Sequence, residues 1–228
     1  MPLLPYDLPT NTPCPSCPNQ RLTDWHIQVC LHNDEQIRRH NNIVDYTVSL
    51  LHSLQRTALL EPNAGLGKSA YDIQTDHLPP NPPNSGSLLL DWTITSPVQQ
   101  SILASNTNLR NCKPLQAATN AFNRKINKYK DLLQLQPPGT KFLPLAIESL
   151  GGTHPEVRNF LLQLAQCASR FSLLSAFQSN ASFVAYHAQA LSVLTHVGTA
   201  NSILDLAKKA NSTFQLAAGT SFNTAIPF

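Results

Sequence analysis

The sequence has little charge and no long apolar run. Asp, Glu, Lys and Arg make up only 13% of its 228 residues, and the formal net charge is +3. Because so small a net charge does not argue for binding to nucleic acid, any such surface must be local. No apolar run reaches the roughly 20 residues that a membrane-spanning helix needs. The N-terminus also lacks the basic and apolar regions of a signal peptide, so we expect an intracellular protein with no membrane partner.

Acidic residues are absent from one long segment. None occurs between Asp91 and Asp131, whereas six basic residues do. These are Arg110, Lys113, Arg124, Lys125, Lys128 and Lys130. A carboxylate at the end of an apolar run, followed by a long basic segment, is one way to arrange a metal-dependent site that acts on a polyanion.

Cysteine is scarce, and its number is odd. Five cysteines in an apparently intracellular chain argue against a disulfide framework and favour metal binding. Cys14, Cys17, His26 and Cys30 follow the spacing C-x2-C-x8-H-x3-C. The C-x2-C turn points two thiolates at one place, and His-x3-Cys spans one helical turn, so four soft donors can form the tetrahedron that zinc prefers. We therefore predict a structural zinc site, with His32 as the alternative fourth ligand.

The hydrophobic pattern predicts a fold of the α/β (α+β) class, with a small mixed sheet flanked by helices. Helical periodicity occurs in four segments, 33–56, 115–133, 155–177 and 180–211, the last broken near Gly198. Strands are predicted at 70–73, 88–95 and 141–149. An irregular Pro-rich arm precedes these elements, and the last third is helical.

Two lysines of the helix predicted at 115–133 differ in their position around the helix. At about 100° per residue, Lys125 lies roughly 60° from the centre of the apolar face and Lys128 roughly 120°. Lys125 therefore borders the buried side, whereas Lys128 points more toward solvent.

Six short motifs follow one another along the first two thirds of the chain. They are the Cys/His pattern, Arg-His-Asn at 39–41, an acid at 72, D-x-T-x-T-x-P from Asp91, K-x2-K-Y from Lys125, and F-x-P-x-x-x-E-x-x-G from Phe142. This order resembles the C-terminal region of non-LTR retrotransposon polyproteins, in which a zinc knuckle precedes a restriction-like endonuclease of the PD-(D/E)XK type. The resemblance covers roughly residues 14–152. No reverse transcriptase sequence is present, so the chain resembles a detached C-terminal piece.

The resemblance implies a metal-dependent endonuclease that nicks target DNA. Asp72 and Asp91 take the places of the two carboxylates that hold Mg²⁺, and Lys125, or else Lys128, takes the place of the catalytic lysine. The residues expected to contact nucleic acid are Arg39, His40, Arg124, Lys128 and Lys130. Glu148 and Tyr129 are expected to assist, with structural roles as the alternative. From the residues alone, the triplet at 39–41 is instead interpreted as a solvated face of its helix.

Some positions depart from the family's pattern. The family's Pro-Asp is Tyr71-Asp72 here, and position 93, where many such nucleases have lysine, is Thr93. Eighteen residues separate Asp72 from Asp91, whereas fourteen separate Asp76 from Asp91, which is nearer the family's usual spacing. Asp76 is therefore the alternative first metal ligand.

The expected organisation has three parts. A Pro-rich arm with the CCHC zinc knuckle spans 1–32, the restriction-like core spans 33–152, and a helical extension spans 153–228. The resemblance implies Zn²⁺ as structural and Mg²⁺ as catalytic cofactor, DNA or RNA as partner, a reverse transcriptase supplied by another chain, and a nuclear location. The alternatives to a nuclease are a non-catalytic zinc-containing nucleic-acid-binding module and a degenerate retrotransposon fragment.

Overall fold

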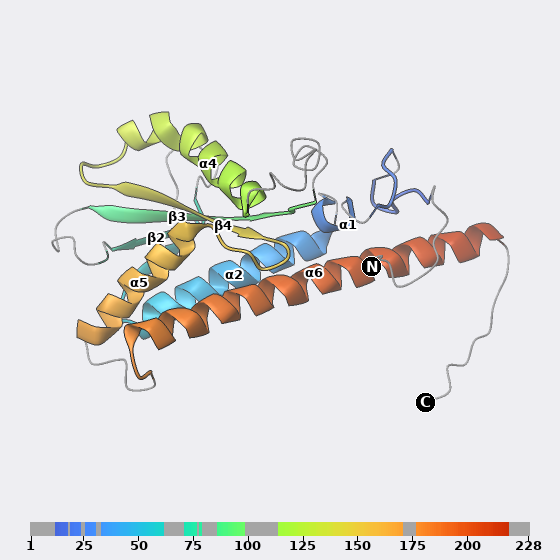
Figure 1. Ribbon diagram of the computed structural model, residues 1–228. Helices are drawn as coiled ribbons and strands as arrows, with labels where there is room; N and C mark the ends of the chain where they lie inside the picture. The colour runs from blue at the N-terminus through green and yellow to red at the C-terminus, as the bar shows by residue number, and fades with distance from the viewer. Residues whose placement is uncertain are drawn as a thin grey trace.

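The computed structural model shows a four-stranded mixed sheet with helices on both faces (Figure 1). It describes residues 12–17, 19–23, 26–30, 33–61, 71–76, 78, 86–98, 114–170 and 177–218. The helices are α1 (His26–Val29), α2 (Asp34–Ser53), α4 (Gln116–Gln134), α5 (Pro155–Arg170) and α6 (Asn180–Ala218). The strands are β1 (Ala58–Leu60), β2 (Ile73–Asp76), β3 (Ser87–Thr95) and β4 (Lys141–Glu148). The expected mixed α+β class is confirmed.

The strands are arranged in the order β1-β2-β3-β4. β2 is antiparallel to both β1 and β3, whereas β3 and β4 are parallel. A parallel pair needs a crossover, and α4 lies within it. The strands predicted at 88–95 and 141–149 are confirmed to within one residue. The strand predicted at 70–73 is displaced, because β2 begins only at Ile73, and the three-residue edge strand β1 is too short to have shown a periodic pattern.

The main hydrophobic core lies between the sheet and helices α2, α5 and α6. Ile43 and Leu51 of α2 meet Trp92 of β3, Ile147 of β4 and Phe160 of α5 in this cluster. Figure 1 shows these three helices on the side of the sheet opposite α4. Burying large apolar side chains from helices and sheet together makes α5 and α6 part of the same core as the strands.

The other face of the sheet is covered by α4 through small residues. Ala118 and Ala121 of α4 pack against Ala146 of β4. Because these side chains are small, the helix approaches the sheet closely, and the side chains along the flank of α4 reach the strands.

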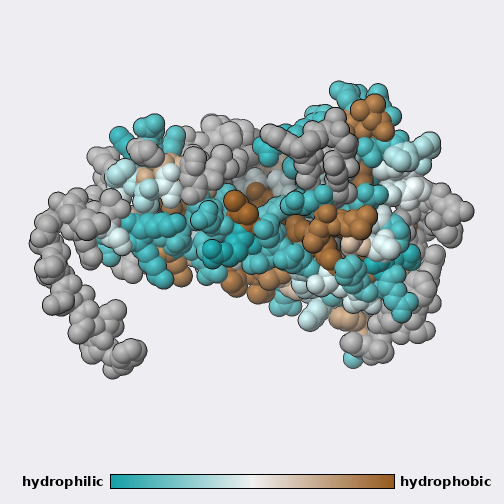
Figure 2. All heavy atoms as spheres, turned by 180° about the vertical axis from the view of Figure 1, so that it is seen from behind, coloured by the Kyte–Doolittle hydropathy of each residue, from teal (hydrophilic) through white to brown (hydrophobic). Residues whose placement is uncertain are grey.

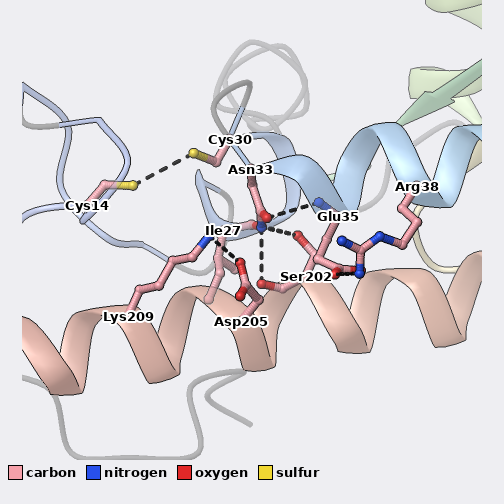
Figure 3. A network of polar contacts seen from close by, with 9 residues as sticks. All are labelled: Cys14, Ile27, Cys30, Asn33, Glu35, Arg38, Ser202, Asp205 and Lys209. Atoms are coloured by element: carbon pink, nitrogen blue, oxygen red, sulfur yellow. Dashed lines mark hydrogen bonds and ion pairs between the residues drawn. The ribbon is translucent and has the colours of Figure 1, made fainter.

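The N-terminal segment packs along the C-terminal half of α6. Leu22, Ile27 and Cys30 share a small core with Leu206 and Ala210 of α6. The amide of Asn33 strengthens this contact, since its Nδ2 donates to Ser202 Oγ at 2.9 Å while its Oδ1 accepts from the N–H of Glu35 and caps α2 (Figure 3).

Two expectations for the C-terminal helices are wrong. α6 continues through Gly198 without a break. A Cβ at this glycine would lie 2.4 Å from Cγ of Arg39, so the glycine allows α2 and α6 to approach each other and does not end the helix. Among the described residues, α5 ends at Arg170, and Phe177 is not helical.

The surface is mixed in polarity. Figure 2 shows hydrophilic residues over much of the face opposite to that of Figure 1, with apolar residues gathered in patches among them. Within the described residues, no helix combines the length and apolar character needed to cross a membrane.

His187 is a buried titratable residue of α6 that lies against α2. Its Nδ1 is 2.6 Å from the hydroxyl of Tyr46, and its ring contacts those of Phe177 and Phe183. Burial lowers the pKa of His187 to about 4. Burial, with a smaller effect of Tyr186, raises the pKa of Tyr46 to about 12. Both groups are therefore neutral in the folded protein at neutral pH.

The free energy of unfolding should fall as the pH drops from about 6.5 to about 4. Over this range the unfolded chain protonates His187 while the folded chain, with a pKa of about 4, does not. The contribution of His187 to the free energy of unfolding is therefore fully present above about pH 6.5. It falls by on the order of 2 kcal/mol as the pH approaches 4. Urea unfolding at several pH values measures the loss. His187→Phe should remove this part of the pH dependence, and the exposed His196→Gln should leave it. An unchanged slope in His187→Phe would contradict the assignment.

Candidate functional site

Asp72 and Asp91 lie near each other where the start of β2 meets β3. β2 and β3 pair in a register that sets Ile73 opposite Leu90, and the N–H of Asp72 donates to the Leu90 carbonyl at 3.0 Å. Asp72 directly precedes β2, and its side chain lines the same pocket as that of Asp91. The N–H of Trp92 donates to Asp72 Oδ2 at 2.5 Å and holds that carboxylate against β3. The strand register thus brings two carboxylates to one point.

Asp76, the alternative partner of Asp91, lies elsewhere. It pairs with Ser87 at the far end of β2, and its side chain is exposed. Four residues of extended chain span about 13 Å. The structure thus separates Asp76 from Asp91, and Asp72 is the carboxylate that lies beside it.

Lys125 of α4 reaches down to the sheet. Its Nζ is 2.6 Å from Asp91 Oδ2 and 5.7 Å from the ring centre of Tyr129. Lys128, three residues later, is exposed, and its Nζ is 3.0 Å from the Tyr129 hydroxyl. The helical geometry expected from the sequence, with Lys125 at the border of the buried face and Lys128 further out, is confirmed.

The charges of this cluster compensate one another. Asp91 is only 4% exposed, and burial raises its pKa; the charge and hydrogen bond of Lys125 oppose the rise, and Asp72 adds to it. His40 Nε2 is 3.2 Å from Asp72 Oδ2. Burial alone would lower the pKa of His40, but chiefly the hydrogen bond and charge of Asp72 raise it above its ordinary value. Each carboxylate therefore has its own basic neighbour, Lys125 for Asp91 and His40 for Asp72.

These side chains line one pocket of about 380 Å³. Its wall is formed by Gln36, Arg39, His40, Asp72, Asp91, Trp92, Thr93, Ile94, Arg124 and Lys125. The hydroxyl of Thr93 is buried and has no hydrogen-bond partner among the described residues. Two carboxylates that meet at a polar pocket can hold a divalent cation, and the adjacent lysine can stabilise negative charge on a bound anion.

The prediction that residues 39–41 form a solvated helix face is wrong for Arg39. This side chain is 4% exposed, and its guanidinium donates to Thr199 Oγ1 of α6 at 2.7 Å. Burial lowers its pKa to about 10. Arg39 therefore ties α2 to α6 and is not free for the nucleic-acid contact expected of it, whereas His40 faces the pocket and Asn41 is exposed.

Glu148 and Tyr129 have structural contacts. Glu148 is buried, and its Oε1 accepts from the N–H of Ala118 in the first turn of α4 at 3.3 Å. Since Leu115 at the start of α4 provides no side-chain cap, Glu148 supplies one from β4. Tyr129 packs edge-on against Phe142 with ring centres 4.9 Å apart. Neither residue lines the pocket.

Arg124 and Lys130, two further residues expected to contact nucleic acid, are exposed on α4. Arg124 lines the pocket beside Lys125, whereas Lys130 does not. Arg110 and Lys113 lie outside the described residues. The basic segment thus divides into Lys125 inside the pocket, Arg124 at its edge, and exposed cations along the helix.

A second cluster gathers the four Cys/His residues singled out by their spacing. The ligand atoms of Cys14, Cys17, His26 and Cys30 all lie within 4.8 Å of one another. Cys30 Sγ is 3.7 Å from Cys14 Sγ and 3.5 Å from Cys17 Sγ. Figure 3 shows Cys14 and Cys30 with their sulfur atoms pointing toward each other beside α6. The four residues are close enough to bind one metal ion.

The donor set suits zinc. Zn–S bonds of about 2.3 Å in a tetrahedron place two sulfurs roughly 3.8 Å apart, close to the separations found. Burial lowers the pKa of His26, which favours the neutral imidazole that binds metal. The alternative ligand His32 lies outside the described residues.

Gln28, between two of these ligands, connects the Cys/His cluster with the sheet. Its Oε1 accepts from Ser96 Oγ at 3.1 Å and from Ser149 Oγ at 2.7 Å, and these serines follow β3 and β4. Its backbone carbonyl accepts from Arg39 at 3.4 Å. A single glutamine in a short helix has no sequence signal for such a role, and only the fold could reveal it.

No protein-family model matches this chain, and no curated protein matches its sequence. The geometry of the two clusters therefore carries the functional argument.

The purified protein should contain one zinc ion per chain, measured by elemental analysis, with three sulfur ligands and one nitrogen ligand in X-ray absorption. Cys30→Ala should lose the ion and lower the melting temperature by roughly 10 °C, which corresponds to about 3 kcal/mol in a chain of this length. The buried Cys167→Ala is the matched control and should keep the zinc. A chain that folds with full stability after chelation would rule out a structural metal.

Proposed function

We propose that this protein is a metal-dependent endonuclease of the restriction-like type, which nicks DNA. The observation that carries the proposal is the contact of Lys125 Nζ with Asp91 Oδ2 at 2.6 Å, in a pocket that Asp72 also lines. The resemblance implies two carboxylates at adjacent strand ends and a lysine from the following helix. The positions of β2, β3 and α4 support this arrangement, and they support a restriction-like core for residues 33–152.

Five residues of the pocket have a role in the proposed reaction. Mg²⁺, when bound by Asp72 and Asp91, supplies an activated water and positive charge beside the scissile phosphate. The Trp92 N–H and His40 orient the Asp72 carboxylate. Lys125 holds its ammonium group beside Asp91, where it stabilises the negative charge that develops on the phosphate.

The exposed cations of α4 support an approach of DNA along this helix. Arg124 lies at the edge of the pocket, and Lys130 is exposed further along. No acidic residue occurs between Asp91 and Asp131 to oppose them. Phosphates that follow α4 would therefore reach the pocket beside Lys125.

A purified sample should nick supercoiled plasmid in the presence of Mg²⁺. Asp91→Asn keeps the size of the side chain but removes its charge, and Lys125→Met removes the ammonium group. Each should lower the nicking rate by about 100-fold or more. The rate of conversion to open circles measures the effect, and circular dichroism checks the fold.

Two variants serve as controls for this experiment. Asp76→Asn and Lys209→Met change residues of the same types that lie away from the pocket and from α4, and both should keep most of the activity. Nicking that survives Asp91→Asn would contradict the proposal. Salt-sensitive DNA binding without any cleavage would favour the non-catalytic binding module, and a chain that neither binds nor cleaves would favour the degenerate fragment.

DNA affinity should depend on the exposed face of α4. In the Asp91→Asn background, Arg124→Ala and Lys130→Ala should each weaken binding several-fold, and each should reduce the slope of log affinity against log salt by about 1. Fluorescence anisotropy at several salt concentrations measures both quantities. Arg158→Ala, on the exposed face of α5, is the matched control. Equal effects of all three substitutions would exclude α4 as the DNA-binding face.

A further inference from the structure

The outer face of α6 carries an apolar stripe that the described residues leave largely exposed, with only the ring of Phe177 against its first member, Tyr186. Tyr186, Val193, Val197 and Leu204 are between 45% and 58% exposed. At about 100° per residue, these four and the two alanines at 190 and 200 lie within roughly 40° of one line along the helix. Their spacing alternates between four and three residues, the pattern of the contact face of a coiled coil.

The opposite face of α6 is already occupied. Val184, Leu191, Leu206 and Ala210 are buried on that side. They face α2, α5 and the N-terminal segment, which lie along the helix in Figure 1. A helix that is apolar on two faces is normally covered on both. Within the part of the chain that the structure describes, the inner face provides the contacts of the fold and the outer stripe is available for a partner.

The stripe carries no charge. From Asn180 to Leu204, α6 contains no Asp, Glu, Lys or Arg. A nucleic acid or a charged protein surface would find no complementary group over these residues. The partner that fits is another uncharged apolar helix face.

The residues of the stripe are arranged symmetrically along the helix axis, at equal numbers of residues before and after Thr195. Tyr186 and Leu204 lie nine residues before and after it, the alanines at 190 and 200 lie five before and after, and Val193 and Val197 lie two before and after. Two copies of α6 packed antiparallel about this level would place Tyr186 opposite Leu204, alanine opposite alanine, and Val193 opposite Val197. The stripe is therefore complementary to itself.

The first charge on the stripe favours the antiparallel arrangement over a parallel one. Lys208 lies about 40° from the same line, and it is exposed. In a parallel pair it would face the Lys208 of the second copy, whereas in the antiparallel pair it faces Ser182, thirteen residues before Thr195. The helix dipoles also oppose each other favourably when the helices are antiparallel.

We infer that two copies of this chain associate through the outer faces of α6, packed antiparallel about the level of Thr195. From Tyr186 to Leu204 the stripe extends over about 27 Å of helix. This is a small interface, so a weak dimer with a dissociation constant on the order of 10 µM is expected. The inference does not depend on the proposed nuclease activity.

Sedimentation equilibrium of the full chain tests the inference. The wild-type protein should be monomeric at low micromolar concentration and dimeric at about 100 µM. Val193→Lys and Val197→Glu should each raise the dissociation constant at least tenfold, because each places a charge at the centre of the stripe. Ile37→Lys, at a residue of α2 that is 60% exposed, is the matched control and should leave the constant unchanged.

Mixing the two variants tests the orientation of the helices. In the antiparallel pair, the lysine introduced by Val193→Lys in one copy lies opposite the glutamate introduced by Val197→Glu in the other. An equimolar mixture of the two variants should therefore recover dimer formation. A parallel pair would leave both charges opposite valine. Ala190→Lys and Ala200→Glu form a second opposed pair, for use if a variant has a lowered melting temperature. A wild-type chain that stays monomeric at about 200 µM overturns the inference, as does a mixture that recovers nothing.

Discussion

The structure of the pocket depends on one buried ion pair, between Asp91 in the third strand and Lys125 in the helix that follows. A carboxylate that is 4% exposed inside a sheet would lose most of its hydration, and its pKa rises for that reason. Lys125 offsets part of this cost at 2.6 Å. Its reach depends on the small alanines that let α4 approach β4. The charge of Lys125 can therefore act on Asp91 only because α4 packs closely against β4.

The second carboxylate is placed by backbone pairing. Asp72 precedes β2, and the pairing of β2 with β3 brings it to the pocket that Asp91 also lines, where the Trp92 N–H and His40 hold it. A shift of one residue in that register would turn the side chains of β2 to the other face of the sheet. This constraint makes the length of the segment between Asp72 and Asp91 unimportant, because a long surface insertion adds little free energy once the strands are paired.

The Cys/His cluster also takes part in holding the molecule together. It packs on α6, and Gln28 links it to the ends of β3 and β4 through Ser96 and Ser149. Arg39 continues this network from α2 to Thr199 of α6. Buried polar networks of this kind fix the relative positions of the elements that they join, since each unsatisfied member would destabilise the fold.

The sequence by itself determined the features that depend on local spacing. The strand at Leu88–Thr95 follows from a short apolar, β-rich run bounded by turn residues. The helix with Lys125 nearer its buried face follows from a period of 3.6 residues, and the four Cys/His donors follow from the spacings C-x2-C and H-x3-C. Each of these patterns involves only residues that are close in the sequence. Only the tertiary structure decided what depends on residues far apart in sequence. It chose Asp72 over Asp76 through strand register, buried Arg39 against Gly198 of a helix about 160 residues away, and turned Glu148 into a cap for α4. Pairing, burial and capping across such separations are properties of the packed fold, and no local pattern of residues encodes them.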